Sequence, residues 1–320
     1  MKLKKEYIGL VVIIMALVLY ILLKNTDRTH YDLPEFSQIE KAGITKLVVN
    51  RIAGNMILQR TGEKWTIEPQ GYPADQSQID KMLDAAGDLT LTSLVSESSN
   101  YSQYELTDDK KIKLEIFTAD GLARQIDIGK AASTYRHTFV RLVDDHRVYQ
   151  ARNNLRQPFE TEVDRLRDKV VSAFDKEFTA AVMITDSSGS LQLSKQEIPP
   201  IPMPGDSMAA AVTEPAPLWQ TADGQAADDK VLDGIIATLS NLRCDSYLEG
   251  RSKEDFNSPI FSISVDGAKP VTLDVYQKQA DNKYPAVSSQ NEYPFLLPEW
   301  TVKRFMKKPS EILKDVTAGE

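Results

Sequence analysis

The sequence predicts an α+β fold: two tandem repeats of an antiparallel β-sheet packed by helices, preceded by one N-terminal transmembrane helix. Three observations predict it. An uncharged, largely apolar run, Tyr7–Leu23, lies near the start of the chain. A stretch that begins at Trp65 returns at Trp219, and short alternating apolar segments follow both copies. An internal repeat indicates a repeated architecture, and alternation favours strands with one buried and one solvated face.

The run Tyr7–Leu23 predicts a membrane anchor within residues 1–28. As a helix it would extend about 25 Å, close to the ~30 Å hydrocarbon core of a bilayer. A cleaved signal peptide is the alternative, but the run exceeds a typical signal core and no small-residue cleavage site follows it. The lysines at positions 2, 4 and 5 outweigh Lys24 and Arg28, which favours a cytoplasmic N-terminus. We therefore expect a single-pass protein of the bacterial inner membrane with a periplasmic or extracytoplasmic body.

A first α+β unit is expected over residues 44–176, after a tether over residues 29–43. Apolar segments at 47–49, 56–58 and 65–67, separated by turns that contain glycine, predict an antiparallel meander. Asp75 is a candidate helix N-cap, with Gln78 placed for a capping box. The helix face that follows repeats at three- and four-residue spacing. It comprises Ile79, Met82, Leu83, Ala86 and Leu89.

Alternating segments resume after the polar residues 96–109. Ile112, Leu114 and Ile116 alternate with polar residues, and Ile126 and Ile128 flank Asp127. A further apolar stripe, from Phe159 through Val163, Leu166 and Val170 to Phe174, predicts a helix that closes the first unit.

The second unit is expected over residues 177–316, followed by a tail at 317–320. Its helix, from Asp228 to Leu242, matches Asp75–Leu89 without a gap. The two units differ most at a proline-rich insertion, residues 196–217. Proline withholds an N–H donor, so the insertion cannot join a sheet interior. It is either a tolerated flexible loop or an arm that docks a partner. The possible docking residues are Ile198, Pro199, Pro200, Ile201, Pro202, Met203, Pro204 and Met208.

Composition excludes several classes of function. The net charge is -8 and no basic run lies in the body, which argues against nucleic-acid binding. The single cysteine, Cys244, allows neither an intrachain disulfide nor a cysteine-based metal site. The sequence contains no nucleotide-binding, hydrolase or zinc-protease motif, so no cofactor and no metal are expected.

Few residues suggest chemistry. Asp144-Asp145-His146 resembles a metal or acid–base cluster, but a polar hairpin turn explains it more simply. The matched pair Asp80 and Asp233 is better explained as solvated helix positions, and the matched pair Trp65 and Trp219 as core residues. Cys244 aligns with Leu91, which indicates a buried small hydrophobe. His30 and His137 form no ligand set. No catalytic, cofactor-binding or metal-binding residue is assigned.

The anchor, the Trp65-Thr66-Ile67-Glu68-Pro69 segment, the Ala74-Asp75 helix start and Leu166-Arg167-Asp168-Lys169 together resemble a family of bacterial envelope proteins, the domain-of-unknown-function family numbered 4340. Its members resemble accessory components of gliding-motility-type ABC transporters. The resemblance implies a non-enzymatic, extracytoplasmic scaffold or accessory subunit of an ABC-type transport assembly, partnered by a permease or another membrane protein. An envelope hydrolase, or a ligand-binding module with a cleft between the two units, is the alternative.

Overall fold

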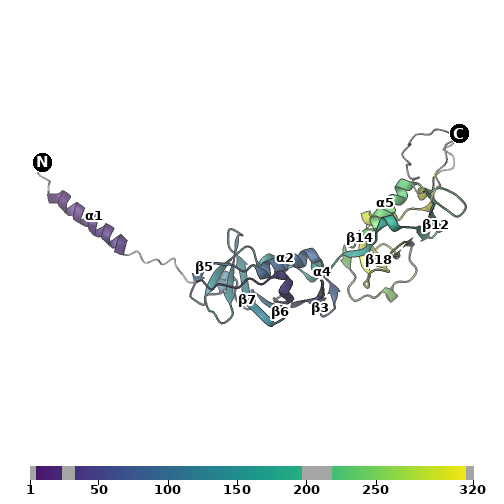
Figure 1. The fold of residues 1–320 in the computed structure, drawn as a ribbon. Coiled ribbons are helices and arrows are strands. Elements are labelled where there is room, and N and C mark those ends of the chain that lie inside the picture. Colours follow the sequence, from purple (N-terminus) through teal and green to yellow (C-terminus); the bar gives the residue numbers. More distant parts are fainter. Residues whose placement is uncertain (1–4, 24–32, 197–217, 315–320) are drawn as a thin grey trace, which may run out of the picture. The chain divides into compact units, whose positions relative to one another are not determined.

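The computed structural model describes residues 5–23, 33–196 and 218–314, and its contacts divide the chain into two compact units, Met1–Arg167 and Asp168–Glu320 (Figure 1). The sequence placed this division after residue 176. The division comes earlier because β10 (Val170–Ala173) forms a two-stranded sheet with β14 (Asn241–Arg243), a strand of the second unit.

Helix α1 spans Lys5–Leu23. Its side chains are described at residues 9 and 12–20, and the large apolar ones among them are between 49% and 64% exposed. Within the described part of the chain, no helix is long and apolar enough to cross a membrane.

Unit 1 contains one nine-stranded sheet, in the order β4-β3-β2-β1-β6-β7-β8-β9-β5. Every recorded pairing in it is antiparallel, and β1 to β3 form the meander that the sequence predicts. The strands are β1 (Ile44–Asn50), β2 (Met56–Thr61), β3 (Lys64–Glu68), β4 (Tyr72–Pro73), β5 (Leu91–Ser96), β6 (Ile112–Thr118), β7 (Gly121–Ala131), β8 (His137–Leu142) and β9 (Val148–Arg152).

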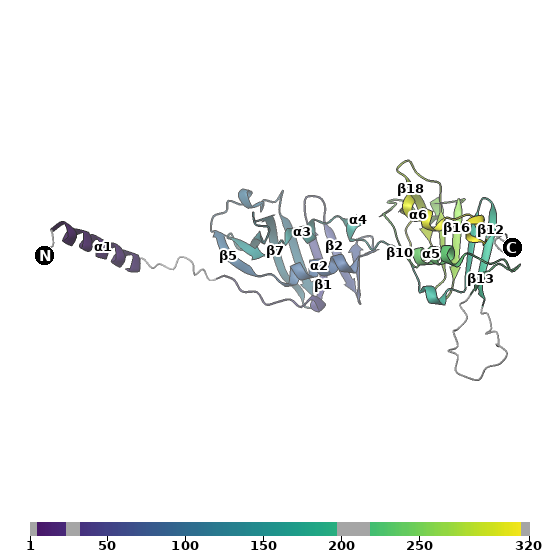
Figure 2. The same ribbon diagram turned by 90° about the horizontal axis from the view of Figure 1, so that it is seen from above.

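Helix α2 (Gln76–Gly87) packs its apolar face on the core of this sheet (Figure 2). Asp75 is the N-cap, and its carboxylate accepts hydrogen bonds from the backbone N–H groups of Ser77 and Gln78. Its own backbone N–H donates to the Leu166 carbonyl at 2.7 Å. Leu166 is thus the acceptor for this N–H, whereas the predicted capping box assigned that acceptor to the Gln78 side chain. The helix start is thus held by a distant segment of the unit.

The segment that precedes β1 packs on unit 1, although the sequence predicted a tether over residues 29–43. Leu33, Phe36 and Ile39 lie against the core, and the short helix η1 (Lys41–Gly43) leads into β1. Arg124 of β7, on the face that bears the core, donates to the carbonyls of Ser37 and Ala86 at 2.6 and 3.3 Å. Only residues 24–32 therefore separate α1 from the packed segment.

The apolar stripe from Phe159 to Phe174 is not one helix, so that prediction is wrong. It is divided among α3 (Arg156–Glu160), α4 (Val163–Leu166) and β10. The backbone is extended at Thr161 and Arg167, and Arg167 forms an antiparallel β-bridge with Ala74. Hydrogen bonds to other segments therefore replace the helical ones, while Phe159, Leu166 and Val171 still reach a core.

Unit 2 contains an eight-stranded antiparallel sheet, in the order β13-β12-β11-β16-β17-β18-β19-β15. Its strands are β11 (Ala181–Asp186), β12 (Gly189–Gln196), β13 (Leu218–Gln220), β15 (Ser246–Tyr247), β16 (Phe261–Asp266), β17 (Val271–Val275), β18 (Lys283–Ser288) and β19 (Phe295–Pro298). Its helices are η3 (Lys176–Phe178), α5 (Asp229–Leu239), η4 (Lys253–Asp255), α6 (Glu299–Phe305) and α7 (Pro309–Ile312).

The start of α5 repeats the contacts seen at α2. Asp228 caps the helix by accepting from the backbone N–H groups of Lys230 and Val231. Its own N–H donates to the Ile312 carbonyl at 2.7 Å, and Ala227 bridges to Leu313. The apolar face of α5 and the side chain of Trp219 join one core with the sheet.

A polar hollow in unit 1

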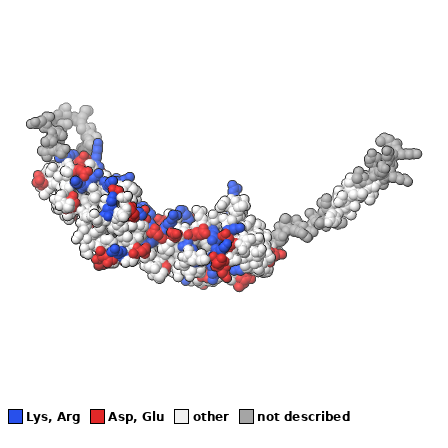
Figure 3. Space-filling model, turned by 180° about the vertical axis from the view of Figure 1, so that it is seen from behind, with Lys and Arg blue, Asp and Glu red and all other residues white. Residues whose placement is uncertain are grey.

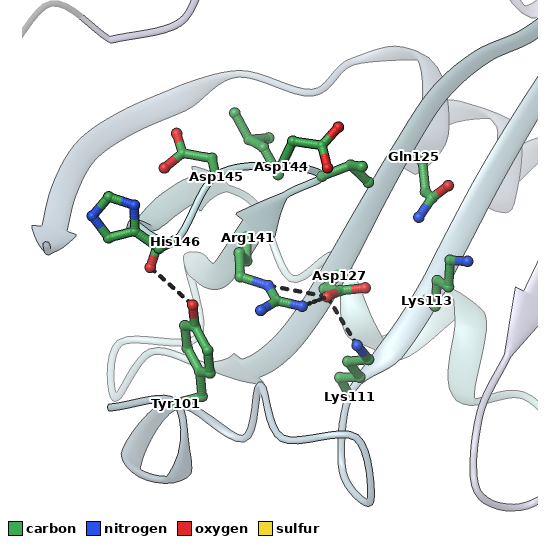
Figure 4. A pocket seen from close by; sticks show the side chains of 11 residues that line it. Tyr101, Lys111, Lys113, Gln125, Asp127, Arg141, Asp144, Asp145 and His146 are labelled. Carbon is green, nitrogen blue, oxygen red and sulfur yellow. Dashed lines mark hydrogen bonds and ion pairs between the residues drawn. The ribbon is translucent and has the colours of Figure 1, made fainter. Parts of the chain in front are cut away.

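A hollow of unit 1 has a volume of about 470 Å³ and lies between β6, β7, β8, the β8–β9 connection and the segment before β6 (Figure 4). Its lining is almost entirely polar or charged. It comprises Tyr101, Lys111, Lys113, Gln125, Asp127, Arg141, Leu142, Val143, Asp144, Asp145 and His146.

The floor of the hollow is a row of side chains across three strands. In the ladder, Lys113 of β6 pairs with Asp127 of β7, which pairs with Arg141 of β8. Side chains opposite one another on neighbouring strands share a face of the sheet. The residues on either side of Asp127, Ile126 and Ile128, point into the core. The charged row therefore lies on the face opposite the helices.

Asp127 is the centre of an ion-pair network, although it lies on the face that alternation predicts to be solvated. It is only 5% exposed. Lys111 Nζ and Arg141 Nε each donate to its Oδ2 at 3.1 Å, and Arg141 Nη2 donates to the same oxygen. Lys111 also pairs with Asp108 at 2.7 Å. A nearly buried carboxylate needs such partners, because an uncompensated charge there would be costly.

The wall beside Asp127 is the connection between β5 and β6, which includes η2 (Ser102–Tyr104). It packs so closely on β7 that a Cβ added to Gly129 would lie 2.2 Å from the Tyr104 carbonyl oxygen. The Tyr104 ring lies 4.9 Å from that of Phe139, and the Arg141 guanidinium lies 4.6 Å from the Tyr101 ring centroid. This connection therefore covers part of the outer sheet face.

The rim is the connection between β8 and β9, where Asp144 has a positive φ of 61°. Asp145 accepts hydrogen bonds from Arg147 Nη2 at 2.9 Å and from the Tyr149 hydroxyl at 2.7 Å. The hydrogen bond from Arg147 is the main reason that the pKa of Asp145 lies well below its usual range. Burial, followed by the hydrogen bond to Asp145, raises the pKa of Tyr149 to about 12.

The pKa values of both cations in the network, Lys111 and Arg141, are shifted upward, which favours their charged forms. Burial lowers the pKa of Lys111, but its hydrogen bonds to Asp108 and Asp127 outweigh burial, and the net shift is upward. For Arg141, burial is likewise outweighed by its hydrogen bonds to Tyr101 and Asp127, so its pKa is raised. The hollow consequently presents fixed cations, an amide and hydroxyl or carboxylate oxygens. Such a set suits binding of a polar group.

Comparison with known proteins places the chain in a family. The family model described as Domain of unknown function (DUF4340) matches residues 65–259, more than half of the chain. The chain belongs to the DUF4340 family. Searches of curated proteins and of solved structures gave no match.

The polar hairpin predicted at Asp144-Asp145-His146 lies in the β8–β9 connection of this DUF4340 chain, at the rim of the hollow. Among the described residues, no group of three or more His, Cys, Asp or Glu side chains could hold a metal ion. His137 lies at the start of β8, and His30 is outside the described residues.

The other predicted residues lie outside the hollow. Asp80 and Asp233 are exposed on α2 and α5, while Trp65, Trp219 and Cys244 are buried, as predicted. The possible docking residues of the insertion fall within residues 197–217, outside the described part of the chain. They are Ile198, Pro199, Pro200, Ile201, Pro202, Met203, Pro204 and Met208.

Sequence reasoning missed the floor of the hollow in this DUF4340 chain. The alternation at 112–116 and 126–128 does place Lys113 and Asp127 on outer faces. It does not say which strands are neighbours or in what register they pair. Only the observed ladder aligns Lys113, Asp127 and Arg141, and only the packed connection before β6 brings in Tyr101 and Lys111.

Proposed function

We propose that this DUF4340 chain is a non-enzymatic, single-pass scaffold or accessory subunit of an ABC-type envelope transport assembly. Tyr7–Leu23 would cross the bacterial inner membrane with the N-terminus in the cytoplasm, and both units would lie in the periplasm or outside the cell. The gliding-motility type of transporter is the assembly that the resemblance of the family suggests. No catalytic role is assigned to any residue.

The observation that carries this proposal is the exposure of the apolar side chains of α1. The large apolar side chains described in it are all about half exposed or more, and neither hydrophobic core includes any of the α1 side chains that the structure describes. A helix that is apolar on all sides needs an apolar environment from outside its own fold. A bilayer supplies one, and the 17 uncharged residues Tyr7–Leu23 are close to the length it requires.

The orientation can be tested with protease added to spheroplasts. The lysines at positions 2, 4 and 5 favour an N-terminus that stays inside. We therefore expect digestion of both units while an N-terminal epitope remains protected. Survival of the units until the membrane is lysed would show that the orientation is inverted.

We also infer that the two units are copies of one fold. The two sheets contain strands in corresponding orders, β1-β6-β7-β8-β9-β5 and β11-β16-β17-β18-β19-β15. Asp75 and Asp228 cap the two helices through the same backbone contacts. A chimaera in which residues 228–242 replace residues 75–89 should still unfold cooperatively. Loss of cooperative unfolding would count against the inference.

The proposed partner is a membrane protein, such as a permease, and not a nucleic acid. On the face drawn in Figure 3, the acidic and basic side chains of the described residues are interspersed, whereas nucleic-acid binding requires clustered cations. The insertion 196–217, proposed as a docking arm, carries Ile198, Ile201, Met203 and Met208 among prolines. An extended, proline-rich segment would lose little conformational entropy on binding.

Affinity purification of the full chain in detergent tests the partner. We expect a permease or an ATPase to co-purify in stoichiometric amount. A variant in which a Gly-Ser turn replaces residues 197–216 should retain its melting temperature and lose the partner. Equal recovery from both proteins would reject the docking arm, and the absence of any transport component from both would reject the accessory function.

A further inference from the structure

We propose that the polar hollow of unit 1 binds a small hydroxylated ligand through an anionic group, a carboxylate or a phosphate. Lys113, Arg141 and Gln125 would contact that group. This inference concerns one unit alone and does not depend on the membrane anchor or on a transport partner.

The first argument is the balance of charge on the floor. Three cations, Lys111, Lys113 and Arg141, surround a single carboxylate, Asp127. The further acidic partners of the two lysines are Asp108, which is 95% exposed, and Glu115, and neither lines the hollow. Asp108 compensates little charge because water screens an exposed partner, whereas Glu115 is only 19% exposed and pairs with Lys113 at 2.8 Å. With Asp127 and Glu115 counted against the three cations, the floor carries an excess of one positive charge.

The rim does not cancel this excess. Asp145 is already paired with Arg147 and accepts a hydrogen bond from Tyr149. Asp144 is exposed at the turn, where it can accept hydrogen bonds from ligand hydroxyl groups. Gln125 and the Tyr101 hydroxyl add groups that both donate and accept. The lining thus combines cations with groups that recognise hydroxyls.

The second argument is preorganisation. The Arg141 guanidinium is held by Asp127 on one side and by the ring of Tyr101 on the other (Figure 4). Tyr101 in turn donates to the His146 carbonyl at 3.2 Å, which ties the wall to the rim. A site whose donors are already fixed loses less entropy when a ligand binds.

The third argument is the corresponding row of unit 2. There the ladder aligns Ser262 of β16, Asp274 of β17 and Val287 of β18. Asp274 accepts a hydrogen bond from the Ser262 hydroxyl at 2.6 Å, without a cation on either neighbouring strand position. Asp127 is more buried than Asp274 and is compensated by Lys111 and Arg141, whereas Lys113 forms its ion pair with Glu115. Compensation of Asp127 therefore does not explain Lys113.

The size of the hollow points to the class of ligand. A volume of about 470 Å³ is within the range of small-molecule sites. The lining offers few apolar groups, Leu142 and Val143 among them, so an apolar ligand would gain little from it. A sugar acid or a sugar phosphate has both the anionic group and the hydroxyls that the lining can pair.

Calorimetric titration of the full chain in detergent with glucose, glucuronate and glucose 6-phosphate tests the proposal. The three probes share a sugar ring and differ in the anionic group. We expect one or both anionic probes to bind at least about tenfold more tightly than glucose, the gain typical of a charge-assisted hydrogen bond. Which of them binds identifies the carboxylate or the phosphate as the preferred group.

Lys113→Gln should weaken that binding by about tenfold or more, with an unchanged melting temperature. Lys46→Gln is the matched control, because Lys46 lies on β1 and contacts Phe117, outside the hollow. Equal affinity for all three probes, no saturable binding of either anionic probe at millimolar concentration, or equal effects of the two substitutions would each overturn the proposal.

Discussion

Arg124 and Asp127 lie three residues apart on β7, and both charged side chains are nearly buried, at 8% and 5% exposed. They lie on opposite faces of the sheet and are satisfied in different ways. Asp127 meets two cations, whereas Arg124 donates to two backbone carbonyls and lies 5.0 Å from the Phe36 ring centroid. Burial lowers the pKa of Arg124. Asp127 thus organises the hollow, and Arg124 holds the segment before β1.

Arg124→Met should detach the segment before β1. The substitution keeps an apolar stem but leaves the carbonyls of Ser37 and Ala86 without their donor, at a cost of about 1–3 kcal/mol in the free energy of unfolding. A protease that cleaves after glutamate should then cut at Glu35 or Glu40 faster than in the wild type. Arg152→Met, at an exposed position, should change stability by about 0.5 kcal/mol or less. Unchanged cleavage in Arg124→Met would contradict this account of the segment.

Asp145 should make the stability of unit 1 depend on pH. Its pKa is lower in the folded protein than in the unfolded chain, mainly because Arg147 donates to it. Its stabilising contribution is therefore complete above the unfolded value of about 3.9 and is lost as the pH falls below it. Asp145→Asn should be less stable than the wild type at pH 7, and the difference should shrink towards pH 3. Denaturant unfolding at several pH values measures this, and a difference that is independent of pH would refute it.

Among the connecting elements, the segment between β5 and β6 decides the shape of the hollow. It crosses the outer face of the sheet and approaches β7 at Gly129, where a side chain would meet the Tyr104 carbonyl. Ion pairs from Lys111 and the ring of Tyr104 against Phe139 hold it there. A polar connection of this kind has no periodicity that would reveal its path.

Gly129→Ala should therefore push this connection away. The added Cβ meets backbone, which cannot rotate aside, so we expect a loss of about 1–3 kcal/mol. Gly234→Ala is the control, since Gly234 lies inside α5 and the added Cβ would have no atom within 4 Å apart from its chain neighbours and the backbone of its own helix. It should stabilise unit 2 by about 0.5–1 kcal/mol, because alanine favours a helix more than glycine does. Thermal unfolding of the two variants compares them, and a neutral Gly129→Ala would show that the connection adapts freely.

The described residues of the chain form two separate hydrophobic cores. One includes Leu83 with the strands of unit 1, and the other includes Ile236 with the strands of unit 2. Each core combines the inner face of one sheet with its own helices. We therefore expect the two units to unfold as two cooperative transitions, since cooperativity follows a shared core.

Leu83→Ala and Ile236→Ala should each lower one of these transitions and spare the other. Both side chains are buried, so each truncation leaves a cavity and should cost about 2–5 kcal/mol. Asp80→Ala and Asp233→Ala, on the exposed faces of the same helices, should cost about 0.5 kcal/mol or less. Calorimetry of the four variants resolves the transitions. A single transition that shifts equally for Leu83→Ala and Ile236→Ala would show that the two units unfold together.

Local chemistry in the sequence determined much of the architecture. The cap Asp75, the start of the second helix at Asp228 and the alternation along β6 and β7 are short-range patterns that the structure places as predicted. The helix faces were predicted too long, because Leu89 lies beyond the end of α2 and Leu242 lies in β14. The segment from Phe159 to Phe174 was mispredicted, because its apolar spacing suits a helix while its backbone hydrogen bonds go to other segments.

The sequence by itself thus determined the α+β class, the two helix starts, the cores beneath them and the uncharged run Tyr7–Leu23. Only the tertiary structure decided that residues 33–43 pack on unit 1, that Asp127 is buried on an outer face and that Lys113, Asp127 and Arg141 share one row. The physical reason is the separation along the chain between the residues that determine each feature. Periodicity and capping depend on neighbours within a few residues, whereas strand register and the path of a polar connection depend on partners far apart in the chain.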